Sequence, residues 1–167
     1  MYPKYFLFIF LCTTPSWLFS QVDTTDCNAL NEIVRMVSTK KIRESDGNIL
    51  DSTATQKNYV LKYHLVDLDD VEELSTTQYS TSSKVSHIER FFAHENLATQ
   101  LAFFEKKVQQ ISQCIPEWDK TTLQDRSGKK GYLYKVLFTN FEDETTVSIQ
   151  FLEINNTLYT TQLQIFN

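Results

Sequence analysis

The chain contains 167 residues and carries a formal net charge of −5 at neutral pH, and 41% of its residues are hydrophobic. This length is typical of a single domain that can bury a hydrophobic core. A moderately acidic chain offers no electrostatic basis for binding nucleic acid or an anionic membrane surface, so we expect neither as a partner.

The N-terminal segment, residues 1–20, has the three-part pattern of a secretory signal peptide. A single basic residue, Lys4, precedes an apolar run over residues 5–12 and a more polar stretch that ends at Ser20. The apolar run is too short to span a bilayer, so no stable membrane insertion is expected once it is removed. The sequence therefore predicts a secreted or periplasmic protein whose single mature domain spans residues 21–167, with the exact cleavage bond left open.

Two helices are expected from apolar residues that recur at spacings of three and four. The first contains Leu30, Ile33, Val34 and Val37, and the second contains Leu97, Leu101, Phe104, Val108 and Ile111. Cys27 lies at the start of the first helix and Cys114 at the end of the second. An even pair of cysteines in an exported chain favours a disulfide, and two free buried thiols are the alternative.

Five strands are expected from alternating apolar and polar residues. They cover residues 58–66, 84–92, 132–139, 145–154 and 158–166. The element order is therefore αββαβββ, which predicts an α+β fold with an antiparallel sheet of about five strands and two helices on one face.

The last two expected strands specify their own register. A three-residue loop at residues 155–157 pairs Ile154 with Leu158 and Ile149 with Leu163, so that apolar residues of both strands share one face. A two-residue turn would instead place an apolar row beside a polar row. The three-residue loop also gathers polar residues on the opposite face, which becomes a candidate partner surface: Ser148, Gln150, Gln162 and Gln164.

A cluster of carboxylates follows the first expected strand and comprises Asp67, Asp69, Asp70, Glu72 and Glu73. A calcium loop is excluded because Val71 and Glu72 occupy two positions that need an oxygen ligand and a glycine. Residues 74–84 have the composition of an exposed loop. We therefore interpret the cluster as a solvated strand end, with weak cation binding or an acidic patch for a basic partner as alternatives.

The three histidines, His64, His87 and His94, lack the spacing of a helical zinc pair, and we expect them to be exposed or bonded structurally. The chain contains neither a phosphate-binding glycine loop nor a nucleophile elbow. The sequence therefore predicts no catalytic residue, no metal ligand and no cofactor.

The runs over residues 27–50, 97–118 and 159–166 resemble, in their layout, small exported bacterial domains of unknown function. These domains are similar to the PsbP/Mog1-like α+β fold and to type III secretion chaperones, and Cys27, Cys114 and Trp118 are the most specific points of resemblance. The resemblance implies an exported helper or binding domain and provides no catalytic residue. It is an analogy of fold, which does not establish function.

These observations favour an exported, non-catalytic interaction module of unknown specificity. Its partner would be another protein that meets the acidic cluster or the polar sheet face. One alternative is a toxin-neutralising or inhibitor-like protein, whose acidity would complement a basic target. Another is an enzyme of unrecognised class, which would need His64 or His87 beside a carboxylate in a deep pocket.

Overall fold

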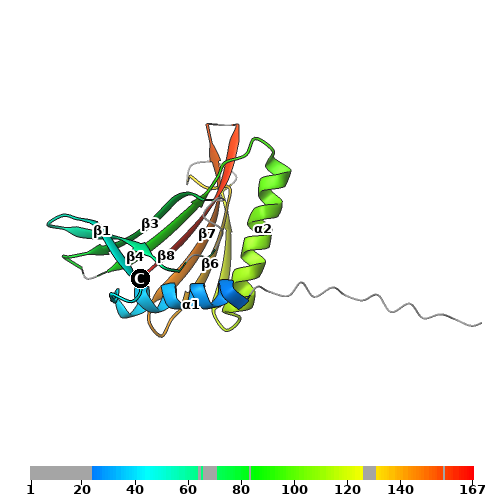
Figure 1. Ribbon diagram of the computed structural model, residues 1–167. Coiled ribbons are helices and arrows are strands. Elements are labelled where there is room, and N and C mark those ends of the chain that lie inside the picture. The colour runs from blue at the N-terminus through cyan, green and yellow to red at the C-terminus, as the bar shows by residue number, and fades with distance from the viewer. Residues whose placement is uncertain (1–23, 64, 66–70, 83, 126–130, 156) are drawn as a thin grey trace, which may run out of the picture.

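A computed structural model describes residues 24–63, 65, 71–82, 84–125, 131–155 and 157–167 (Figure 1). The elements, in chain order, are α1 (Thr24–Thr39), β1 (Gly47–Ser52), β2 (Gln56–Leu61), β3 (Val71–Tyr79), β4 (Val85–Phe91), α2 (Leu97–Cys114), β5 (Asp119–Gln124), β6 (Tyr134–Asn140), β7 (Thr145–Ile154) and β8 (Leu158–Phe166). Within this part of the chain, neither helix is long and apolar enough to cross a membrane. The predicted signal peptide lies outside the described residues.

The strands form one antiparallel sheet of eight strands in the order β1-β2-β3-β4-β8-β7-β6-β5. The expected sheet of about five strands and the order αββαβββ are therefore wrong. The observed order divides into two similar halves, each a helix followed by four consecutive strands. Because β4 and β8 pair at the centre, β1 and β5 form the two edges of the sheet.

The two helices bury their apolar stripes against the sheet, and Figure 1 shows α1 crossing in front of the strands with α2 set at an angle to it. On α1, Leu30, Ile33 and Val37 are completely buried at helical spacing, as the sequence predicts. On α2, Phe104 and Ile111 enter the same core. Helix α2 begins at its N-cap residue Asn96, whose side chain accepts a hydrogen bond from a backbone amide of the first turn.

The register predicted for the last hairpin is confirmed. Ile154 lies opposite Leu158 and Ile149 lies opposite Leu163. Asn155 adopts a left-handed backbone with φ 53°, which asparagine tolerates better than most residues. The apolar sides of β6, β7 and β8 face the core, and their completely or nearly completely buried residues are Val136, Phe138, Val147, Ile149, Phe151, Leu163 and Ile165.

Three strands were absent from the sequence-based prediction: β1, β3 and β5. The exposed loop expected over residues 74–84 is wrong, because β3 covers Val71–Tyr79. All six residues of β5 are exposed, and five of the six residues of β1 are exposed. Edge strands with such polar sequences bury too little apolar surface to produce an alternating pattern.

Candidate functional site

The two cysteines that survive the predicted processing are joined in the structure. The Sγ atoms of Cys27 and Cys114 lie 1.93 Å apart, and the Cα atoms lie 5.2 Å apart. The bond ties the start of α1 to the end of α2, as the sequence predicts. A disulfide is consistent with a protein of an oxidising compartment, either periplasmic or extracellular.

The acidic cluster is only partly described. Asp67, Asp69 and Asp70 lie outside the described residues, whereas Glu72 and Glu73 belong to β3. Glu73 pairs with Arg90 of the neighbouring strand at 2.9 Å, and both side chains are well exposed to water. Among the described residues, no group of three or more acidic, histidine or cysteine side chains is placed to hold a metal ion.

The structure separates the histidines. His64 lies outside the described residues, and His94 is exposed and exchanges two backbone hydrogen bonds of 2.8 Å with Tyr159. His87 is completely buried on β4, where Glu89, two residues further along, points to the same face. Glu89 was not predicted from the sequence, although the alternation of Val85, His87, Glu89 and Phe91 is the signal that would have placed it in the core.

His87 and Glu89 form a buried polar cluster with Thr76 of β3. The Thr76 hydroxyl lies 2.7 Å from Nδ1 of His87, and Nε2 of His87 lies 3.0 Å from Oε1 of Glu89. A ring that is protonated at Nε2 donates to Glu89 and accepts from Thr76, which satisfies both ring nitrogens. The amide of Leu65 also donates to Oε1 at 3.4 Å.

The second carboxylate oxygen of Glu89, Oε2, has no hydrogen-bond partner among the described residues. Glu89 lines a cavity of about 20 Å³, together with Leu65, Phe91 and Ile111. A cavity of that size holds one water molecule at most. Within the described part of the chain, the His87–Glu89 pair therefore lacks the space beside it that a substrate would require.

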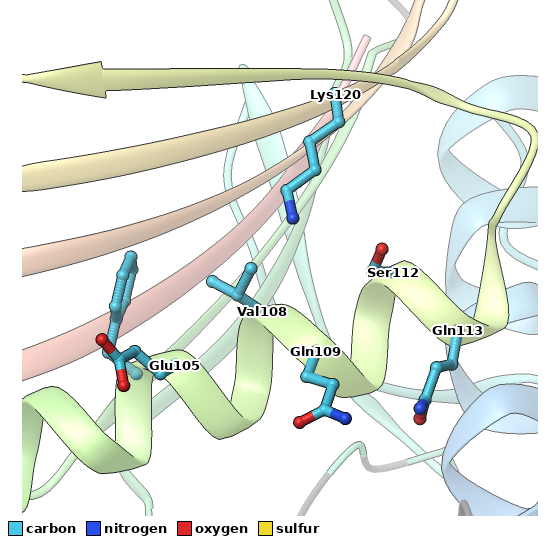
Figure 2. A pocket seen from close by; sticks show the side chains of 7 residues that line it. Glu105, Val108, Gln109, Ser112, Gln113 and Lys120 are labelled. Atoms are coloured by element: carbon cyan, nitrogen blue, oxygen red, sulfur yellow. The ribbon is translucent and has the colours of Figure 1, made fainter.

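A larger hollow lies between α2 and the edge strand β5, and we call it the α2–β5 groove. Its volume is about 310 Å³, and it is lined by Phe104, Glu105, Val108, Gln109, Ser112, Gln113 and Lys120 (Figure 2). Phe104 and Val108 provide an apolar floor. The polar lining residues around it are Glu105, Gln109, Ser112, Gln113 and Lys120. An apolar surface with a few polar groups around it is the usual composition of a ligand site.

Lys120 provides the positive charge of the groove. Figure 2 shows its side chain extending from β5 toward α2, with Glu105 farther along the helix. The Nζ atom lies 5.6 Å from the centre of the Phe138 ring, a cation–π contact. Lys120 makes no ion pair with any described residue. The groove therefore combines an apolar floor with an ammonium group that can receive an anion.

Comparisons with known proteins do not assign this site. No family model, no curated protein and no solved structure matches the chain. The resemblance in layout to PsbP/Mog1-like domains and secretion chaperones gains no support from these comparisons. No residue role is transferred from either group.

Proposed function

We propose that the protein is an exported, non-catalytic binding module whose ligand occupies the α2–β5 groove. The observation that carries this proposal is the groove itself, with about 310 Å³ above an apolar floor of Phe104 and Val108. Ligand pockets in proteins begin at about this volume. The disulfide supports the exported character, because such bonds persist in oxidising compartments.

The other partner surface considered from the sequence, the polar sheet face, is less suited to this role. Several described groups on it are already engaged with one another. Arg90 pairs with Glu73 at 2.9 Å and donates to Gln162 at 3.1 and 3.2 Å. A partner on that face would have to compete with these bonds, whereas Lys120 in the groove has no ion pair to give up within the described structure.

The enzyme alternative needs polar groups that converge beside a cavity that admits a substrate. His87 and Glu89 converge, but the cavity that Glu89 lines has a volume of about 20 Å³. The groove is large enough, yet it contains neither histidine nor cysteine among its lining residues. At these two sites, the facts favour binding over catalysis.

The proposal can be tested with 1-anilinonaphthalene-8-sulfonate, an apolar anion whose fluorescence rises in apolar surroundings. We expect saturable binding to the mature protein. The Val108→Glu variant should lose it, because the new carboxylate fills the groove floor and repels the sulfonate. Val108 is only partly buried, so the variant should keep its fold, which is checked by its melting temperature.

The matched control is Lys106→Glu, an exposed position on the same helix that does not line the groove. It introduces the same carboxylate and should leave dye binding unchanged. Equal dye binding by the wild-type protein and the Val108→Glu variant would show that the groove is not the site and would refute the proposal.

A further inference from the structure

We propose that the ligand of the α2–β5 groove is an extended polypeptide segment that pairs with the free edge of β5 and places a carboxylate at Lys120. This inference rests on the proposed function and specifies its ligand class. Addition of a strand to an exposed sheet edge is a general mode of peptide recognition, in which backbone bonds give affinity and side-chain pockets give specificity.

The backbone pairing determines which groups of β5 face outward. In an antiparallel sheet, alternate residues of a strand bond to opposite neighbours. His94 and Tyr159 exchange both backbone bonds at 2.8 Å, so the odd-numbered residues of β8 face β4 and the even-numbered residues face β7. Followed through the register of β7 and β6, this alternation pairs the odd-numbered residues of β5 with β6.

The end of the β5–β6 pair agrees with this assignment, because the amide of Asp125 donates to the carbonyl of Leu133 at 3.1 Å. The even-numbered residues Lys120 and Thr122 therefore direct their backbone N–H and C=O groups to the outer edge. No described strand pairs with that edge, since β5 ends the strand order. These groups are available to a ninth strand.

The side chains of the same two residues lie on the helix-covered face of the sheet, and Lys120 lines the groove. Lys120 lies opposite Phe138 and Thr122 lies opposite Val136, and both partners are buried on the helix-covered face of the sheet. Side chains alternate along a strand, so an added strand would direct every second side chain toward that face. There the groove offers the apolar surface of Phe104 and Val108. One segment can thus bond to the outward backbone groups of β5 and fill the groove at the same time.

The two sheet edges differ in a way that favours β5. The pairing of β1 with β2 shifts between Ile49 and Asp51, and such a bulge disrupts further strand addition at an edge. The pairing of β5 with β6 is continuous from Asp119 to Gln124, without a shift. All six residues of β5 are exposed. The regular edge is the one beside the groove.

Lys120 specifies the charge of the segment. Its ammonium group extends into the groove and makes no ion pair with a described residue, so a carboxylate on the ligand would complement it. The carboxylate can come from an acidic side chain or from the C-terminus of the segment. Both sources present a carboxylate to Lys120, and peptide analogues that lack one or the other distinguish them.

The test uses random peptides about ten residues long, displayed on phage and selected on the mature protein, a length that covers a typical strand. An enriched peptide is resynthesised and its affinity is measured for the wild-type protein and for Thr122→Pro. Proline removes an outward N–H while leaving the β5–β6 bonds intact, so we expect about tenfold weaker binding or worse. Thr122→Ala, which keeps the N–H, is the matched control and should bind within about twofold of the wild-type protein.

The charge is tested with Lys120→Met, which keeps the length of the side chain. We expect about tenfold weaker binding of the selected peptide and no loss for an analogue without the carboxylate. Replacing acidic side chains by amides in one analogue, and amidating the C-terminus in another, identifies which carboxylate is used.

Two results would overturn the inference. If no peptide is enriched while the sulfonated dye still binds in a groove-dependent way, the groove takes a small apolar anion and the proposed function stands. If enriched peptides bind Thr122→Pro as tightly as the wild-type protein, the β5 edge is not used. If neither the dye nor any peptide binds at the groove of the wild-type protein, the proposed function is refuted as well.

Discussion

The most informative perturbation of the fold is Asp46→Asn, because the Asp46 carboxylate is completely buried and joins α1 to the turn before β1. It accepts a hydrogen bond of 2.8 Å from the Arg43 amide and one of 2.7 Å from Nη2 of Arg35 on α1. The Arg43 guanidinium lies 3.5 Å away. Gly47 follows at once, where a Cβ atom would meet the carbonyl oxygen of Val60 at 2.3 Å, so the backbone after Asp46 packs closely against β2.

The expected loss of stability follows from these contacts. Hydrogen bonds to charged groups contribute about 1.5–3 kcal/mol, and breaking a fully buried ion pair costs about 3–5 kcal/mol. The Arg35 side chain is 27% exposed, so water can hydrate part of its charge once the ion pair is removed, which reduces the loss of stability. We therefore expect Asp46→Asn to lower the free energy of unfolding by about 2–3 kcal/mol near neutral pH.

The effect should depend on pH. Burial alone would raise the pKa of Asp46, but hydrogen bonds from the Arg43 amide and Arg35, together with the charges of both arginines, outweigh burial and lower that pKa. The unfolded-state pKa is about 3.9. Stabilisation by the carboxylate is therefore complete above that value and disappears as the pH falls through the lower, folded-state pKa.

Urea denaturation of the wild-type protein and the variant, from about pH 7 down to about pH 2, measures this difference. Glu44→Gln, an exposed position in the same turn, is the control and should change stability by less than about 0.5 kcal/mol. A difference between wild type and Asp46→Asn that stays constant down to about pH 2 would contradict the role of the ionised carboxylate.

The other predictions concern the disulfide, the acidic cluster and the buried pair. Serine at Cys27 and Cys114 should cost about 4–5 kcal/mol in the chain-entropy model, given the sequence separation of 87, and the oxidised mature protein should contain no titratable thiol after denaturation. Asn at Asp69 and Asp70 should change stability by about 0.5 kcal/mol or less, and calcium should leave the melting temperature unchanged; a rise that the double variant abolishes would reveal a site. Glu89→Leu removes the acceptor of His87, so a double-mutant cycle with His87→Phe should give a coupling of at least about 1 kcal/mol, and additive effects would contradict the hydrogen bond.

The elements that the sequence predicted correctly are those that bury a regular apolar face. Helix α2 and strands β7 and β8 repeat apolar residues at the helical or strand period, and their bounds follow closely. The hairpin register was predictable because Ile149 and Leu163 had to share a face with their neighbours. The disulfide followed from two cysteines at the facing ends of two helices.

The remaining elements could not be recognised because their sequences are polar. Strand β3 was interpreted as a loop, since its buried residue is Thr76, which enters the core through its hydrogen bond to His87. Strand β5 exposes every residue and shows no alternation in burial. The α2–β5 groove depends on the distance between a helix and this unrecognised strand, so no local pattern could have predicted it.

The contrast between the two halves of the sheet explains where the groove can form. At the central seam, His87 and Glu89 of β4 lie opposite Ile165 and Leu163 of β8, so buried polar side chains of the first half meet apolar side chains of the second. A cluster of four aromatic rings lies in the second half. Those of Phe104, Phe151, Tyr134 and Tyr159 form a chain of neighbours with centroids 5.7 to 6.4 Å apart.

Phe104 belongs both to this aromatic cluster and to the floor of the groove. Packed aromatic side chains hold one geometry, and binding sites are most precise when a rigid shell supports them. The groove floor is therefore pre-organised by the core beneath it, while the outer wall is the edge strand β5, with which no second described strand pairs beyond β6. Affinity from backbone bonds at an open edge and specificity from side-chain contacts with a fixed apolar floor are the two contributions that recognition of an extended segment requires.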